Sequence, residues 1–162
     1  MNAELEEAAN AIARSITADA DEGRRDARMF LHTLGRMELG ELAVSDAERA
    51  ELIERTTEPV GRAVVPLGSS LSAFESWLIG HEYYGDDWSF ACRQRSEIQF
   101  LRDIYLPRID EDPESWMDPG EVDYMMQHAA QLEGGLSADR IPPRVPTSHF
   151  WWWLPDAPPA TR

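Results

Sequence analysis

Apolar residues recur at intervals of three and four through most of the first 135 residues of this chain. An α-helix has 3.6 residues per turn, so this spacing gathers them on one face, whereas a half-buried strand needs strict alternation. The stripe in residues 3–18 consists of Leu5, Ala8, Ala9, Ile12, Ala13 and Ile16. The spacing therefore predicts an all-α fold.

The same periodicity predicts further helices. Residues 24–37 carry the stripe Ala27, Phe30, Leu31 and Leu34. Residues 88–106 carry the stripe Ala91, Ile98, Leu101 and Tyr105. A last helix follows the cap Asp118-Pro119-Gly120-Glu121 and carries Val122, Met125, Met126, Ala129 and Leu132. Pro107 and the Gly134-Gly135 pair are stop signals for the last two helices.

Two capping boxes indicate helix starts between these segments. Ser45 with Glu48, and Ser72 with Glu75, have the spacing at which a side chain and a backbone amide satisfy each other reciprocally. Pro59 either ends the helix that starts at Ser45 or opens a short new one. Residues 60–65 fit a helical face or a short strand, and periodicity does not decide between them.

The composition changes after Gly135. Six of the eleven prolines and no glycine fall in residues 142–162, which rules out a regular helix or a central strand there. We therefore predict five or six amphipathic helices in one compact domain, residues 1–135, followed by an extended Pro/Trp-rich arm, residues 136–162.

The arm contains the most unusual run of the chain, His149, Phe150, Trp151, Trp152 and Trp153. Large aromatic side chains either bury against the protein itself or dock into a partner, and Trp is frequent among binding hot spots. Both interpretations stay open. Strand-like alternation predicts Trp151 and Trp153 on one face and Trp152 on the other.

The charge balance excludes several function classes. The chain has 15 basic and 30 acidic residues, a net charge of −15, and every basic residue is arginine. Without lysine there is no P-loop, kinase or Schiff-base chemistry. The acidic surplus is spread over both halves and argues against general nucleic-acid binding. A high-salt cytoplasm, a GC-rich genome and mimicry of nucleic acid each account for it.

Arginines nevertheless concentrate in one predicted helix, residues 88–106, as Arg93, Arg95 and Arg102. Arginine forks bind carboxylates in a bidentate manner. These three residues either pair with acids of the same chain or form part of a partner-binding site together with the aromatic arm.

Enzymatic chemistry has weaker support. Cys92, the only cysteine, reads most simply as a small buried residue, although a nucleophilic pair with His81, His128 or His149 stays open. The histidine spacing favours no metal site, and no cofactor is expected. His81, Glu82 and Asp86 form the best alternative acid–base site.

These observations predict a non-enzymatic interaction or adaptor subunit of a larger cellular or viral assembly. Its expected partner is another protein or a second copy, not a membrane. An acidic inhibitor that mimics nucleic acid and a small enzyme near His81 are the alternatives. No stretch has the length of a membrane span or the pattern of a signal peptide, so a cytoplasmic location, or a particle assembled inside the cell, is expected.

Overall fold

The computed structural model describes residues 1–80, 88–109, 118–133 and 136–154, with the backbone alone for 130–133. The helices of these residues are α1 (Ala3–Ser15), α2 (Ala20–Glu38), α3 (Asp46–Arg62), α4 (Val64–Gly80), α5 (Trp88–Tyr105) and α6 (Gly120–Glu133). Short 3-10 turns are η2 (Leu106–Arg108), η3 (Ala138–Arg140) and η4 (Phe150–Trp152). The described residues contain no strand, which confirms the predicted all-α fold.

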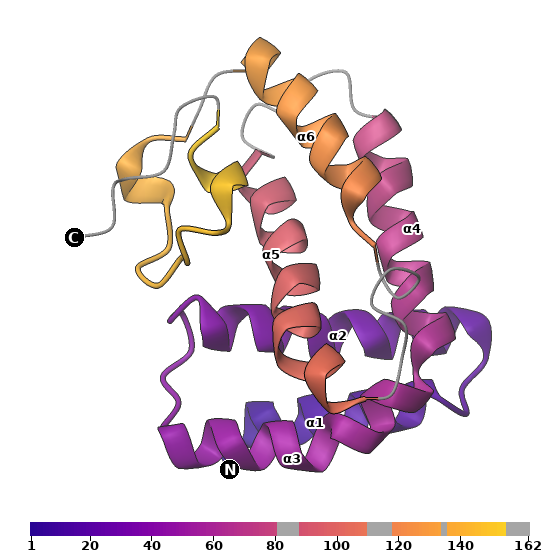
Figure 1. Ribbon diagram of the computed structural model, residues 1–162. Coiled ribbons are helices and arrows are strands. Elements are labelled where there is room, and N and C mark those ends of the chain that lie inside the picture. The colour runs from indigo at the N-terminus through magenta and orange to yellow at the C-terminus, as the bar shows by residue number, and fades with distance from the viewer. Residues whose placement is uncertain (81–87, 110–117, 134–135, 155–162) are drawn as a thin grey trace.

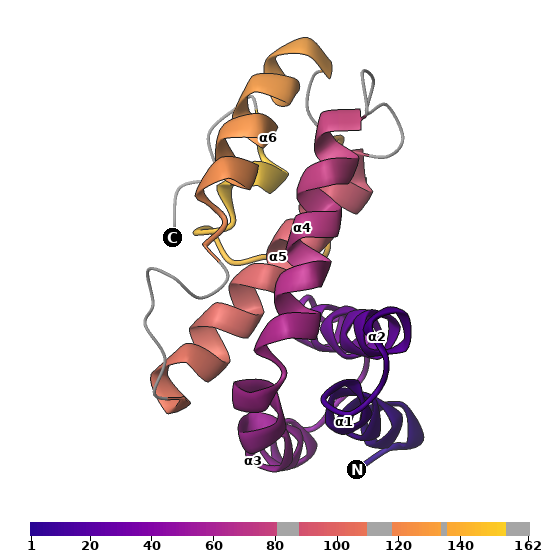
Figure 2. The same ribbon diagram turned by 90° about the vertical axis from the view of Figure 1, so that its right-hand side faces the viewer.

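The helices form two groups. Helices α1, α2 and α3 pack at one end of the molecule, and α4, α5 and α6 extend away from them (Figures 1 and 2). Helix α5 has the most varied neighbours, because it contacts α2, α3, α4 and the C-terminal turn η4. The position of α5 therefore depends on its packing against all of these elements.

The predicted apolar faces form that core. The α2 stripe is buried, and Phe30 meets the ring of Tyr105 from α5 edge-on, with ring centroids 6.0 Å apart. The Tyr105 hydroxyl lies 2.6 Å from Oγ1 of Thr56 on α3, so the buried phenol has a polar partner. Each large side chain buried in this way contributes about 1.5–3 kcal/mol to stability.

Local signals set the helix starts. Oδ1 of Asn2 accepts from the Leu5 amide at 3.0 Å and caps α1. Ser45 and Glu48 form the reciprocal capping box that the sequence predicts at the start of α3. Oδ1 of Asp118 accepts from the Gly120 amide at 3.0 Å, just before α6. Each contact satisfies an amide that has no partner inside its helix.

The structure corrects two predictions for residues 59–75 and decides a third. Pro59 neither ends nor starts a helix, because it lies inside α3, which continues to Arg62. Residues 60–65 are helical apart from Ala63, the residue between α3 and α4. The Ser72 capping box is wrong, because α4 runs through it without a break. Leu67, Leu71, Phe74 and Leu78 are buried along that one helix, and their burial outweighs the local start signal.

The C-terminal residues 136–154 lie beside the N-terminal half of α5 (Figure 1). Residues 150–152 form the 3-10 turn η4, so the strand-like alternation predicted for the tryptophans is wrong. Trp151 and Trp152 are both buried, whereas Phe150 and Trp153 are half-buried. The division of the chain at residue 135 stays a prediction.

None of the described helices is both long enough and apolar enough to cross a bilayer.

Candidate protein-interaction surface

One face of α2 presents a mixed cationic and apolar surface. Arg25, Arg28, Met29 and His32 are all exposed on α2, and Met29 retains 42% of its accessible area. Arg25 and Met29 are four residues apart, as are Arg28 and His32, so the four side chains form neighbouring pairs on the helix surface.

Helix α5 extends this surface. Nη2 of Arg28 donates to Oε1 of Gln94 on α5 at 3.1 Å, which connects the two helices. Phe90, one turn before Gln94, is 38% exposed and lies edge-on against Trp77, with ring centroids 5.1 Å apart. We call the set Arg25, Arg28, Met29, His32, Phe90 and Gln94 the α2–α5 patch.

The arginines of the patch differ from most others in the described part of the chain. Eight arginines there form ion pairs with carboxylates: Arg14, Arg24, Arg36, Arg49, Arg55, Arg62, Arg93 and Arg95. Arg28 instead bonds to the neutral amide of Gln94, and Arg25 has no ion pair or hydrogen bond among the described residues. The patch therefore keeps exposed positive charge in a strongly acidic protein.

A buried carboxyl group lies beneath the patch. Glu97 on α5 is only 5% exposed, and its Oε1 lies 3.2 Å from Nδ1 of His32. Nε2 of Gln94 donates to Oε2 of Glu97 at 2.9 Å. Gly35 of α2 makes room for this side chain, because a Cβ there would lie 2.6 Å from Cγ of Glu97.

Burial and pairing shift both titratable groups. Burial raises the pKa of Glu97, while His32, Arg28 and Arg93 act against that rise. The hydrogen bond to Glu97 raises the pKa of His32, although partial burial and the charges of Arg36 and Arg93 oppose it. The pKa values of both groups are therefore raised, and the two groups titrate as one coupled pair.

The aromatic arm is fastened to α5 through Ser96. Nε1 of Trp152 donates to Oγ of Ser96 at 2.8 Å, and Nε1 of Trp151 lies 3.1 Å both from that Oγ and from the Cys92 carbonyl oxygen. Nδ1 of His149 lies 3.1 Å from the same Oγ. Because the two indoles fill both acceptor positions of the hydroxyl, Ser96 donates its proton to Nδ1 of His149, which places the imidazole proton on Nε2.

Arg95 completes this junction. It is 3% exposed, and its Nε and Nη2 donate to the carboxylate of Asp123 on α6 at 2.5 and 2.9 Å. Its guanidinium carbon lies 4.2 Å from the ring centroid of Trp151, a cation–π distance. Within the described residues, Nη1 of Arg95 and Nε2 of His149 are buried without a hydrogen-bond partner.

These contacts place several predicted partner-binding residues inside the protein's own fold. His149, Trp151 and Trp152 are at most 1% exposed, and Arg95 is nearly as buried. Phe150 and Trp153 are half-buried, Arg93 pairs with Glu41, and Arg102 on α5 is half-buried. The structure supports self-packing for the three buried rings. A partner role for the arm and for Arg102 stays a prediction.

The residues expected for an enzymatic or metal site do not form one in the described structure. Cys92 is fully buried, its Sγ lies 3.5 Å from the Trp151 carbonyl oxygen, and burial raises its thiol pKa, the opposite of what a nucleophile needs. The proposed acid–base residues His81, Glu82 and Asp86 lie outside the described residues. Within the described ranges, no three His, Cys, Asp or Glu side chains are grouped as metal ligands.

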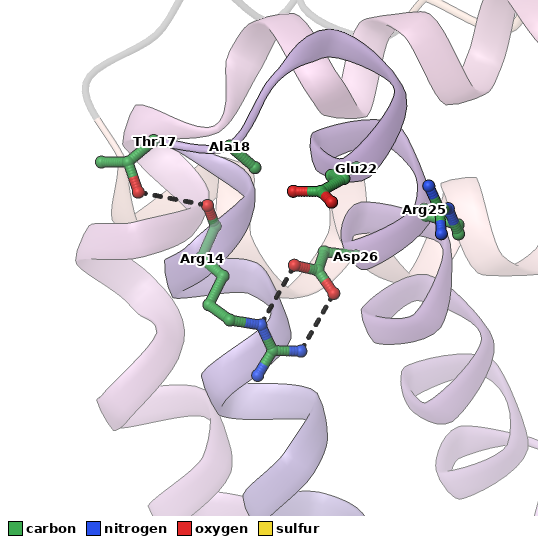
Figure 3. A pocket seen from close by; sticks show the side chains of 6 residues that line it. All are labelled: Arg14, Thr17, Ala18, Glu22, Arg25 and Asp26. Atoms are coloured by element: carbon green, nitrogen blue, oxygen red, sulfur yellow. Dashed lines mark hydrogen bonds and ion pairs between the residues drawn. The ribbon is translucent and has the colours of Figure 1, made fainter.

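A surface pocket lies between the end of α1 and the start of α2 (Figure 3). Nε and Nη2 of Arg14 donate to both oxygens of Asp26 at 3.1 and 2.9 Å, and Glu22 lines the same hollow. Figure 3 shows Arg25 apart from the Arg14–Asp26 pair. Arg25 lines the same hollow but has no hydrogen bond or ion pair there among the described residues.

No local sequence pattern marks the α2–α5 patch. The spacing of Arg24 and Arg28 indicates an exposed cationic face, but the sequence does not show which arginines find acids. His32 and Glu97 are 65 positions apart, so no local motif marks their contact. The one available signal is a glutamate within the apolar pattern of residues 88–106.

No family model matches the chain, and comparisons with curated proteins and with solved structures give no match.

Proposed function

We propose that this protein is a non-enzymatic interaction subunit that binds an acidic segment of another protein through the α2–α5 patch. The docking surface is then the α2–α5 patch and not the aromatic arm. Residues His149, Trp151 and Trp152 of the arm are occupied by contacts with α5, whereas the patch is exposed.

The observation that carries the proposal is the absence of a carboxylate ion pair at Arg25 and at Arg28 in the described structure. The chain has twice as many acids as bases, yet neither side chain forms an ion pair with a carboxylate in the described structure. Arginine forks favour planar carboxylates, so carboxylates from outside the chain fit this surface.

The apolar members of the patch favour a protein partner. Arginine, methionine and aromatic residues are enriched at protein interfaces. Exposed Met29 follows Arg28 directly on α2, and exposed Phe90 lies one turn before Gln94, the residue that Arg28 binds. The net charge of −15 opposes acidic peptides and phosphate-rich polymers alike, so the apolar members of the patch are what favour a protein.

The arm has a supporting role in this proposal. Ser96 binds the arm one residue before Glu97 and two residues after Gln94, on the helix that forms half of the patch. The arm therefore helps to hold α5 in the position that the patch requires.

The test uses a fluorescein-labelled deca-glutamate peptide and fluorescence anisotropy at low salt. The variant Arg25→Gln/Arg28→Gln removes two positive charges from the patch. The matched control Arg55→Gln/Arg62→Gln removes two exposed charges from α3, where both arginines pair with acids. We expect the patch variant to bind about three- to tenfold more weakly than the wild type and the control to change less than about twofold.

Three results would contradict the proposal. They are an absence of peptide binding, equal weakening in both double variants, and tighter binding of a labelled oligothymidylate of the same length than of the peptide. Circular dichroism of each variant checks that the helices remain folded.

A further inference from the structure

The patch has a titratable pair built into it. His32 exposes 58% of its side chain at the surface, whereas the side chain of its partner Glu97 is 6% exposed. Nδ1 of His32 lies 3.2 Å from Oε1 of Glu97. Protonation of the surface imidazole therefore changes the electrostatic environment of the buried carboxyl group.

The surroundings of this pair are mostly cationic. The charged side chains near the pair are Arg28 and Arg36 on α2 and Arg93 on α5. Gln94 supplies the neutral hydrogen bond to the second oxygen of Glu97. Glu4 of α1 pairs with Arg36, and Glu41 pairs with Arg93, so two of the three flanking arginines are already neutralised.

We propose that the His32–Glu97 pair acts as a proton switch that strengthens binding of acidic partners to the α2–α5 patch as the pH falls from 8 to 6. This inference rests on the proposed function. It adds that the affinity of the surface depends on pH and assigns that dependence to one pair.

The direction follows from charge. When the pair takes up one proton, the patch gains one positive charge next to Arg28, which has no carboxylate ion pair of its own in the described structure. Glutamates of a partner have pKa values near 4.3, so they stay ionised at pH 6. The attraction between patch and partner therefore increases at lower pH.

The side-chain hydrogen bond to Glu97 raises the pKa of His32 above its ordinary value of 6.5, so this ring takes up its proton at a higher pH than a free imidazole does. Two other histidines of the described structure differ from it. The pKa of His149 is lowered to about 3, so this ring stays neutral in the same range. His128 is exposed on α6, and no residue of α6 belongs to the patch.

The experiment measures binding of the labelled deca-glutamate peptide at pH 8, 7 and 6 and constant ionic strength. We expect the wild-type affinity to rise about two- to fivefold from pH 8 to pH 6. His32→Gln should bind with nearly constant affinity, because an amide can still donate to Glu97 but takes up no proton. The matched control His128→Gln should retain the wild-type dependence.

The outcomes separate the two proposals. Peptide binding that is independent of pH, or a His32→Gln variant that retains the full dependence, overturns the switch and leaves the proposed function standing. An absence of peptide binding overturns the proposed function. In that case, NMR titration of the His32 ring in wild type and Glu97→Gln still tests the pair, since the variant should titrate at lower pH, and an equal pKa in both would overturn the switch.

Discussion

The indole nitrogen of Trp152 lies 2.8 Å from the hydroxyl oxygen of Ser96, although the two residues are 56 positions apart. Trp151 and His149 meet the same hydroxyl group, so one small side chain of α5 satisfies three aromatic groups of the C-terminal residues. Removal of the Ser96 hydroxyl group therefore takes a hydrogen-bond partner on α5 from all three aromatic side chains.

Ser96→Ala should reduce the free energy of unfolding by about 2–4 kcal/mol. The substitution leaves the buried Trp152 N–H and the Nδ1 acceptor of His149 without partners, and each unsatisfied group costs about 1–3 kcal/mol. Urea denaturation followed by circular dichroism measures the loss. Ser69→Ala is the matched control, because the Ser69 hydroxyl is exposed and donates only to its own helix. Equal stability of the two variants would mean that Ser96 does not hold the arm.

Trp152→Ala should destabilise the protein by about 3–5 kcal/mol, the usual cost of truncating a fully buried aromatic side chain, and Trp151→Ala should behave alike. Trp153→Ala should cost clearly less, because this ring is half-buried. Thermal and urea melts of the three variants give the order. A Trp153 variant as unstable as the Trp151 variant, with a clearly milder effect at Trp152, would instead support the strand-like alternation.

Gly35→Ala should destabilise the protein by about 1–3 kcal/mol, since the added methyl group would lie 2.6 Å from Cγ of the buried Glu97. Gly68→Ala on α4 is the matched control, because no atom lies within 4 Å of a Cβ at that position. The control should gain about 0.5–1 kcal/mol from the better helix propensity of alanine. Chemical denaturation of both variants measures the difference, and stabilisation by both would show that Glu97 does not pack against Gly35.

His149 should make the fold sensitive to acid. Burial, together with the charge of Arg95, lowers the pKa of His149 to about 3 in the folded protein, whereas the unfolded chain has a value near 6.5. The unfolded state therefore binds the proton first, so the stability contributed by the neutral ring is complete above pH 6.5 and is lost as the pH falls towards 3.

The measurement compares the free energy of unfolding at pH 7 and pH 4 in the wild type and in His149→Asn, which keeps an acceptor in place of Nδ1. The loss on acidification should be smaller in the variant, since the carboxylates titrate in both proteins and only the imidazole is absent. His128→Asn, at an exposed position, should lose as much as the wild type. Equal losses in all three proteins would place His149 in a solvated environment.

Much of the secondary structure was determined by the sequence alone, because its causes are local. The stripe Ala27, Phe30, Leu31 and Leu34 predicts the buried face of α2, and Ser45 with Glu48 predicts the start of α3, since these residues interact within one or two helical turns. The bounds predicted for the helix over residues 88–106 differ from those of α5 by one residue.

Tertiary structure decided where local signals compete with burial. The Ser72 capping box is a valid start signal in isolation, yet two buried apolar residues before Ser72 and two after it share one face, so α4 continues. Likewise, Ala11 rather than Ala13 is buried in α1, because the neighbouring helices α2 and α3 determine how wide the buried face is.

The candidate site depended almost entirely on tertiary structure. The sequence shows that acids outnumber arginines, but only the fold brings Asp123 of α6 to Arg95 and brings Arg28 of α2 to the neutral amide of Gln94. The sequence also shows that Trp151 and Trp152 need an apolar environment. Only the fold brings Ser96 to their indole N–H groups, because hydrogen bonds between residues more than 50 positions apart require both segments to be placed by the core.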